Sequence, residues 1–288
     1  MNRSYLFVPA DSERKMQRAA DVGADALILD LEDSVAPDAR PTARQLAREY
    51  IQGTGNVWVR INPVDSDDAP ADLEAVMPAA PAGIVLPKPH SAGAVTRLAK
   101  RLDQLEDAND IEAGSTNILP ICTETPDAIF TMGGYSADTP RLAGLTWGAE
   151  DLSAAVGAAA NRDEQGNWLP PYELSRSLCL LAAAAAEVPA IDTVYTDFRN
   201  AEGLATYAAN ARRDGFSGML AIHPDQVDVI NRAFVPTSTE IERARRIVEL
   251  FDENPGAGTL GLDGQMMDRP HLVQAQRILQ LAKRLAAL

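Results

Sequence analysis

The chain has 288 residues, and its 46% of hydrophobic residues is ample for the core of one large domain. A formal net charge of −15 at pH 7 and a pI near 4.6 argue against nucleic acid and anionic membranes as partners. No apolar run reaches membrane-spanning length, and the first residues lack signal- or transit-peptide composition. Cys122 and Cys179 lie inside apolar runs, as expected for core residues in a reducing compartment. We therefore expect a soluble, cytoplasmic globular protein.

Short apolar runs, many of them β-branched, recur about every 20–35 residues, which is the spacing of β-α units. The predicted strands cover residues 4–9, 26–31, 57–62, 83–87, 118–123, 142–147, 190–196 and 217–223. Amphipathic segments with helical spacing lie between them, including residues 13–22, 41–51, 92–105, 172–186 and 201–213.

The predicted strands are continuously apolar rather than alternating, which suits a parallel sheet that is covered on both faces. Eight β-α units in alternation predict an α/β fold of the (β/α)8 TIM-barrel type. An open doubly wound sheet is the alternative. The chain has neither a Gly-x-Gly-x-x-Gly motif after the first strand nor a Walker-type phosphate loop to favour that alternative.

The pattern changes after Phe234. Residues 237–252 predict a charged amphipathic helix, residues 254–268 a Pro/Gly-rich connector and residues 270–287 a closing helix. We therefore predict a TIM-barrel catalytic domain over residues 1–235. A C-terminal helical extension over residues 236–288 is expected to pack on that barrel or on a neighbouring subunit.

Polar side chains gather where the predicted strands end, which is where TIM-barrel enzymes place their active sites. These strand ends carry carboxylates, two cations and one histidine: Asp11, Asp30, Glu32, Asp33, Arg60, Lys88, Glu124, Glu150, Asp151, Asp197 and His223. The sequence therefore predicts an acidic site at this end of the barrel.

Glu124 and Asp151 stand at the ends of adjacent predicted strands and are the first choice as metal ligands. Mg²⁺ takes oxygen ligands in octahedral geometry and usually keeps water or substrate oxygens in the remaining positions. The alternative is that the two carboxylates cap the helices that follow. One of Asp30, Glu32 and Asp33 could support the metal ligands, or the trio could form a salt-bridged strand end.

Four basic side chains have two interpretations each. Arg60 needs an anionic partner, either a protein carboxylate or a carboxylate or enolate of a substrate. His223 is the only histidine at a predicted strand end, and a lone histidine is more often a hydrogen-bonded core residue than a base. Arg14 and Arg18, four residues apart on the first predicted helix, form a face that could hold phosphates or could simply be solvated.

These strand ends, in this order, resemble the citrate lyase β-subunit group of the HpcH/HpaI aldolase superfamily nearly from end to end. The first shared motifs are RSYLFVP at 3–9, ALILDLEDSVAP at 26–37, VRIN at 59–62 and LPK at 86–88. The remaining motifs are ET at 124–125, GAEDL at 148–152, GFSGM at 215–219, IHPDQ at 222–226 and DGQMMDRP at 263–270. Each motif alone is weak, but so many in register make the resemblance specific.

The resemblance implies a Mg²⁺-dependent carbon–carbon lyase that acts on a β-hydroxyacyl-CoA thioester, such as malyl-, citramalyl- or citryl-CoA. It implies Glu124 and Asp151 as metal ligands in contact with substrate, and Arg60 as the catalytic residue that holds a substrate oxygen. Arg14 and Arg18 match positions that meet CoA phosphates. Asp268 matches a catalytic acid/base that completes the active site of a neighbouring subunit in a homotrimer.

Two departures from the family leave the acyl group open: Ala10 replaces a frequent glycine, and Asp127 lies in the loop after Glu124. Thioester hydrolysis or a malate-synthase-like condensation would fit the same residues. The citryl-carrier-protein lyase subunit of a citrate lyase complex is a further candidate, as is a pyruvate aldolase that does not use CoA. Outside the enzymes, the candidate is a binding protein that senses an acyl-CoA.

Overall fold

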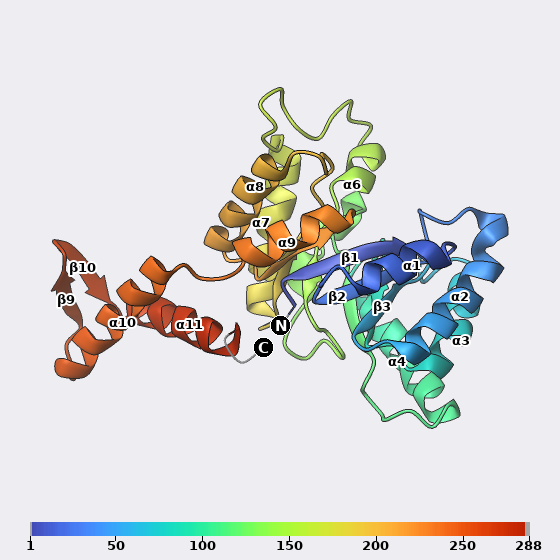
Figure 1. The fold of residues 1–288 in the computed structure, drawn as a ribbon, viewed down its shortest axis with the longest axis horizontal. Coiled ribbons are helices and arrows are strands. Elements are labelled where there is room, and N and C mark those ends of the chain that lie inside the picture. Colours follow the sequence, from blue (N-terminus) through green and yellow to red (C-terminus); the bar gives the residue numbers. More distant parts are fainter. Residues whose placement is uncertain (1, 286–288) are drawn as a thin grey trace. The chain divides into compact units, whose positions relative to one another are not determined.

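The computed structural model describes residues 2–285, and the chain divides into two compact units, Met1–Asn231 and Arg232–Leu288. In the first unit, strands and helices alternate along the chain (Figure 1). Its strands are β1 Ser4–Pro9, β2 Ala26–Asp30, β3 Val57–Arg60, β4 Gly83–Leu86, β5 Asn117–Pro120, β6 Leu145–Thr146, β7 Ala190–Asp192 and β8 Gly218–Ala221.

The eight strands form one parallel sheet in the order β5-β4-β3-β2-β1-β8-β7-β6. Parallel bridges from Ile118 to Leu142 and from Ile121 to Thr146 join its two edges. The sheet is therefore a nearly closed barrel, which confirms the predicted TIM-barrel fold and excludes the open doubly wound sheet.

Helices follow the strands and cover the outside of the barrel, as Figure 1 shows for α1 to α4 and α7 to α9. The α-helices are α1 Glu13–Ala20, α2 Arg40–Gly53, α3 Ala69–Val76, α4 Ala92–Ala108, α5 Pro126–Ile129, α6 Glu150–Ala155, α7 Pro170–Ala185, α8 Ala201–Asp214 and α9 Pro224–Ala233. Short 3₁₀ turns are η1 Pro37–Ala39, η2 Met77–Ala79 and η3 Met132–Gly134. Each of the five helices predicted in this unit overlaps one of these. None of the helices within residues 2–285 has the length and apolar character needed to cross a membrane.

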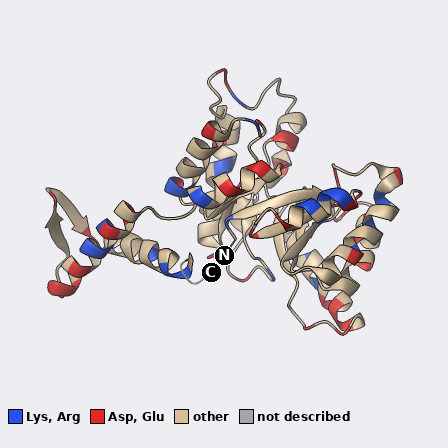
Figure 2. Ribbon diagram, viewed as in Figure 1, with Lys and Arg blue, Asp and Glu red and all other residues tan. Residues whose placement is uncertain are grey.

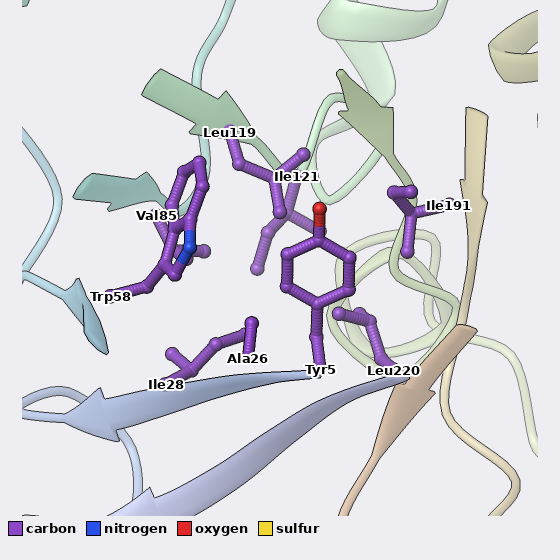
Figure 3. Packing of buried hydrophobic residues seen from close by; sticks show 9 residues of the cluster. All are labelled: Tyr5, Ala26, Ile28, Trp58, Val85, Leu119, Ile121, Ile191 and Leu220. Atoms are coloured by element: carbon purple, nitrogen blue, oxygen red, sulfur yellow. The ribbon is translucent and has the colours of Figure 1, made fainter. Parts of the chain in front are cut away.

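The interior of the barrel is filled with buried apolar side chains from seven of its strands and from Ile121, just after β5. Figure 3 shows them pointing toward one another: Tyr5, Ala26, Ile28, Trp58, Val85, Leu119, Ile121, Ile191 and Leu220. The indole of Trp58 lies against Gly83, where an added Cβ would come within 2.3 Å of the ring, so glycine is required there. Because successive strand residues alternate in direction, the inward positions further along carry Phe7, Asp30 and Arg60. Two members of this cluster, Ile121 and Leu220, also line the open space at the carboxyl end of the barrel.

The second unit is two helices joined by a hairpin. α10 Ser238–Glu253 begins at a capping box formed by Thr237 and Glu240, and α11 Arg269–Leu285 is the closing helix. Residues 286 and 287 of the predicted helix lie outside the described residues. Between the helices, β9 Thr259–Leu262 and β10 Gln265–Asp268 pair antiparallel where only a connector was predicted. Asp263 and Gly264, both at positive φ (52° and 75°), form the two-residue turn, which is a common hairpin sequence.

Candidate active site

A cavity of about 390 Å³ opens at the carboxyl end of the barrel strands. Residues from almost every strand end contribute to its wall. The polar part of the lining is Asp30, Asp33, Ser34, Arg60, Glu124, Glu150, Asp151 and Thr193. The strand-end rule therefore located the cavity correctly, and both proposed metal ligands face it.

Arg60 lies in this wall and is held by carboxylates at the end of β2 and just after it. Its Nε and Nη2 donate to the two carboxylate oxygens of Asp30 at 2.7 and 2.6 Å. Its Nη1 lies 3.0 Å from Glu32 Oε2, as an ion pair without hydrogen-bond geometry. Burial alone would raise the pKa of Asp30, but the bonds from Arg60 outweigh it and hold that pKa below its usual range. Of the two partners considered for Arg60, the protein carboxylate is present.

Lys88 connects the two sides of the cavity. Its Nζ lies 2.6 Å from Glu32 Oε1 and 3.2 Å from Asp151 Oδ1, and its backbone N–H donates to Glu124 Oε2 at 2.7 Å. Its φ of 49° is in the left-handed region, which is uncommon for a residue with a side chain and typical of functional sites. One residue thus contacts both proposed metal ligands, a link that the strand-end pattern did not predict.

Glu124 is the most perturbed carboxyl group in the cavity. It is 4% exposed, and it lies so close to Gly148 that a Cβ there would be 2.8 Å from Glu124 Cγ. Burial, and then the negative charges of Asp151 and Glu32, raise its pKa to about 8. Burial is the larger cause, the charges of Asp151 and Glu32 add to it, and the contacts with Lys88 do not offset the two effects.

The negative charges beside Glu124 are what a divalent cation would relieve. Within residues 2–285 no cluster of three or more His, Cys, Asp or Glu side chains is suited to a metal. Mg²⁺ needs no such cluster, since it commonly takes one or two carboxylates and completes its shell with water and substrate oxygens. The buried, charge-stressed Glu124 beside Asp151 fits that kind of site.

Trp147 and its partners beside this wall were not predicted as site residues, whereas Glu150 was among the predicted strand-end carboxylates. Trp147 is fully buried, and its indole N–H donates to Asp192 Oδ1 at 2.6 Å. Asp192 is in turn bound by Arg176 and by the hydroxyl of Tyr207. Glu150, next to Asp151, accepts a hydrogen bond from Asn161 at 3.0 Å. The position of Trp147 directly before the Gly-Ala-Glu-Asp motif was the available signal.

A second cavity, of about 460 Å³, is basic where the first is acidic. Its polar lining is Arg14, Lys15 and Arg18 of α1 together with His223, and Figure 2 shows blue segments on α1. Phe7, Pro9 and Ile222 line both cavities, so the two adjoin. The structure thus brings Arg14 and Arg18 beside the acidic cavity, and it places His223 in the basic one rather than at the proposed metal ligands.

Asp268 lies at the end of β10 in the second unit, where its Oδ1 is 2.5 Å from His271 Nδ1. The bond to His271 holds the pKa of Asp268 below its usual range. Asp127, which was expected in a loop after Glu124, lies in α5, and its Oδ2 is 2.6 Å from Nδ1 of His90. Neither His90 nor His271 was singled out in the sequence.

The chain matches the sequence profile of the HpcH/HpaI aldolase/citrate lyase family over residues 3–224, and that of the carbon–carbon bond lyases of the TIM-barrel fold over residues 174–286. It therefore belongs to the HpcH/HpaI aldolase/citrate lyase family and is a carbon–carbon lyase, as the resemblance implied.

Curated relatives match almost the whole chain. A (3S)-malyl-CoA thioesterase of Cereibacter sphaeroides is 34% identical, covering 99% of this chain and 96% of the relative. The citrate lyase subunit beta of Escherichia coli is 34% identical, covering 98% and 93%. Among solved structures, the CitE protein of Mycobacterium tuberculosis in complex with magnesium, acetoacetate and coenzyme A has a TM-score of 0.85 and 32% identity, covering 98% of each chain.

Proposed function

We propose that this protein is a Mg²⁺-dependent CoA-ester lyase that cleaves a β-hydroxyacyl-CoA of the malyl-, citramalyl- or citryl-CoA type. The products are acetyl-CoA, or a related acyl-CoA, and an oxoacid. The observation that carries the proposal is the adjoining pair of cavities, one acidic with Glu124 and Asp151, the other basic with Arg14 and Arg18. An acidic cavity loaded with Mg²⁺ suits the 2-oxoacid half of the substrate, and a basic cavity suits CoA phosphates.

Each residue has a distinct part in this mechanism. Glu124 and Asp151 hold the metal, and bound Mg²⁺ supplies the Lewis acidity that polarises the oxygens of the 2-oxoacid half. Arg60, fixed in orientation by Asp30, stabilises negative charge at the reacting oxygen. Cleavage of the carbon–carbon bond leaves the enolate of the acyl-CoA. The β-hydroxyl gives up its proton as the bond breaks; the Asp268 carboxylate takes up this proton and passes it to the enolate carbon, and in the condensing direction it removes the proton from that carbon and returns it to the new hydroxyl.

The test is a panel of malyl-, citramalyl- and citryl-CoA assayed with Mg²⁺ and with EDTA. Turnover that survives EDTA refutes the mechanism. Asp151→Asn is expected to abolish turnover and the rise in melting temperature that Mg²⁺ causes. Glu150→Gln is the matched control, because Glu150 lines the same cavity but bonds to Asn161. Loss of the Mg²⁺ effect in Glu150→Gln but not in Asp151→Asn would mean that the wrong carboxylate is assigned.

Thioester hydrolysis is the second candidate, because a relative that covers 99% of this chain is a (3S)-malyl-CoA thioesterase. The two reactions release different products from malyl-CoA. Cleavage gives glyoxylate and acetyl-CoA, with the thioester intact, whereas hydrolysis gives malate and free CoA thiol. Measuring oxoacid and free thiol in the same reaction separates them. A citryl-carrier-protein substrate in the panel tests whether the chain acts as a lyase subunit.

We further infer that Asp268 acts in the active site of a neighbouring copy within a homotrimer. Arg60→Ala removes the substrate contact in the barrel, and Asp268→Asn removes the acid/base in the second unit. Neither variant alone should turn over substrate. A mixture refolded together should regain part of the activity if the two residues meet across copies. Absence of recovery, once subunit exchange is verified by mass, would contradict the inference.

Buried free thiols at Cys122 and Cys179 suit the proposed cytoplasmic location.

A further inference from the structure

Asp268 has a partner in its own unit, His271, to which the proposed mechanism gives no part. Asp268 is the last residue of β10 and stands directly before α11. Its Oδ1 lies 2.5 Å from His271 Nδ1 and accepts the backbone N–H of His271 at 3.4 Å. A side chain that accepts the backbone N–H three residues further on is a helix cap. This cap stabilises α11, and it also fixes the Asp268 carboxylate.

The two oxygens of this carboxylate have different surroundings. Both contacts with His271 are made by Oδ1, and within residues 2–285 Oδ2 has no hydrogen-bond partner. An ionised carboxylate can only accept hydrogen bonds, so the contact of 2.5 Å requires that Nδ1 of His271 carries the hydrogen. The Asp268 side chain is 32% exposed. His271 therefore occupies Oδ1 and leaves Oδ2 available for proton transfer.

His271 is also the group that determines the charge state of Asp268 in this unit. Its bond holds the pKa of Asp268 below the usual range, so the carboxylate is ionised and can accept a proton. No other charged side chain in the described part of the chain contacts this carboxylate. Arg243 and Arg246 of α10, which reach the hairpin, pair with Asp263 at its turn instead. β9, the strand paired with β10, carries no charged residue.

We propose that His271 is a positioning residue of the lyase reaction, which holds Oδ1 of Asp268 so that Oδ2 takes up and delivers the proton. This inference rests on the proposed function, in which Asp268 is the acid/base. The β-hydroxyl proton passes to Oδ2 as the carbon–carbon bond breaks, and Oδ2 then gives it to the enolate carbon. Asp268 is thus a carboxylate again at the end of the turnover, and His271 keeps its Nδ1 hydrogen throughout.

The experiment measures kcat and KM against pH, with whichever of malyl-, citramalyl- and citryl-CoA the wild type cleaves fastest. His271→Ala should lower kcat roughly 10- to 100-fold, the loss that a misplaced reacting group causes, and should leave KM unchanged. Without the bond the pKa of Asp268 rises, so the acid limb of the kcat profile should move to higher pH. The acidic cavity that Asp268 faces is the same in every variant, so this shift reports on position 271.

His271→Asn tests the bond itself. Its side-chain amide places an N–H where Nδ1 stands, so this variant should restore kcat and the position of the acid limb. If His271→Asn is no more active than His271→Ala, the positioning role is wrong. If His271→Ala does not fold, His271→Leu, which is of similar size and also lacks a donor, takes its place with the same expected results.

Glu240→Ala is the matched control for a loss of helix capping. Glu240 holds the same place in the capping box of α10, three residues after Thr237, as His271 holds after Asp268. Its kcat and pH profile should equal those of the wild type. A loss of kcat in Glu240→Ala as large as that in His271→Ala would mean that capping of the second unit, and not the aim of Asp268, is responsible.

The outcomes separate this inference from the function on which it rests. If Asp268→Asn is inactive while His271→Ala has the kcat and pH profile of the wild type, the inference is refuted and the proposed function stands. If Asp268→Asn is as active as the wild type, the acid/base assignment and this inference fail together. If the wild type cleaves none of the three thioesters, the proposed function itself fails.

Discussion

Substituting Gly148 by alanine tests the proposed metal ligand Glu124 without changing its chemistry. A Cβ at position 148 would lie 2.8 Å from Glu124 Cγ and 3.1 Å from its Oε1. Ordinary Cβ contacts begin at 3.4 Å, so the carboxylate or the backbone must move by about 0.6 Å. The side chain of Glu124 cannot easily move away, because it is 4% exposed and its Oε2 accepts a hydrogen bond from the Lys88 N–H at 2.7 Å.

A displacement of this size exceeds what a metal site tolerates, since ligand distances hold to within about 0.2 Å. We therefore expect Gly148→Ala to weaken Mg²⁺ binding by roughly 10- to 100-fold, the loss typical when a ligand is misplaced. The overpacking itself should cost about 1–3 kcal/mol of unfolding free energy.

Two measurements follow the effect: calorimetric titration with Mg²⁺, and the Mg²⁺ concentration that gives half-maximal turnover. Gly133→Ala is the matched control, because a Cβ at position 133 meets nothing within 4 Å. Its Mg²⁺ affinity should equal that of the wild type. If Gly148→Ala and Gly133→Ala bind Mg²⁺ equally well, Glu124 is not the ligand that we propose.

Two further predictions concern buried ion pairs. Arg141 and two backbone N–H groups outweigh the effect of burial and lower the pKa of Glu106 to about 2, from an ordinary 4.5. The ionised Glu106 therefore contributes its full stabilisation of the fold above about pH 4.5, and this contribution is lost as the pH falls toward 2. Glu106→Gln should lower the free energy of unfolding, measured with urea, by about 3 kcal/mol at pH 7 and by less at pH 3. An equal loss at the two pH values would contradict the stabilising role of the Glu106 carboxylate. Arg60→Lys should lower kcat about 100-fold or more in steady-state assays, because an ammonium cannot donate to both oxygens of Asp30 and also reach the substrate. Circular dichroism should show that the fold of this variant is intact. An unchanged kcat would mean that Arg60 has no part in the mechanism.

The barrel was predictable because burial on both faces leaves continuous apolar runs in the sequence. β1 has the predicted bounds, but β6 covers only residues 145–146 of the predicted 142–147. Trp147 is fully buried without belonging to the ladder, so the apolar run reports burial rather than strand pairing. The sequence analysis did not predict the hairpin β9–β10, although its turn carries a recognisable signal. Its Asp263-Gly264 pair is a turn signal, but the short, partly exposed strands beside it carry little apolar periodicity.

The sequence predicted which residues of the candidate site stand at strand ends, but it did not predict the contacts between them. The rule brought Arg60, Glu124 and Asp151 to one cavity, as the structure has them. The sequence could not give the left-handed backbone of Lys88, which turns its N–H toward Glu124, since nothing local requires it. It also could not choose a partner for Arg60 among several nearby carboxylates, because that choice depends on side-chain directions in the folded barrel.

The arrangement of charge explains why so acidic a chain needs a cation to bind an anionic substrate. Six carboxyl groups line the acidic cavity or contact Arg60 or Lys88 there: Asp30, Glu32, Asp33, Glu124, Glu150 and Asp151. Arg60 and Lys88 are already shared among these groups, so neither offers a substrate carboxylate an uncompensated charge. The 2-oxoacid half should therefore bind only together with Mg²⁺, and by reciprocity it should tighten Mg²⁺ binding by the same factor. CoA, which we place over Arg14 and Arg18 in the basic cavity, has no such dependence.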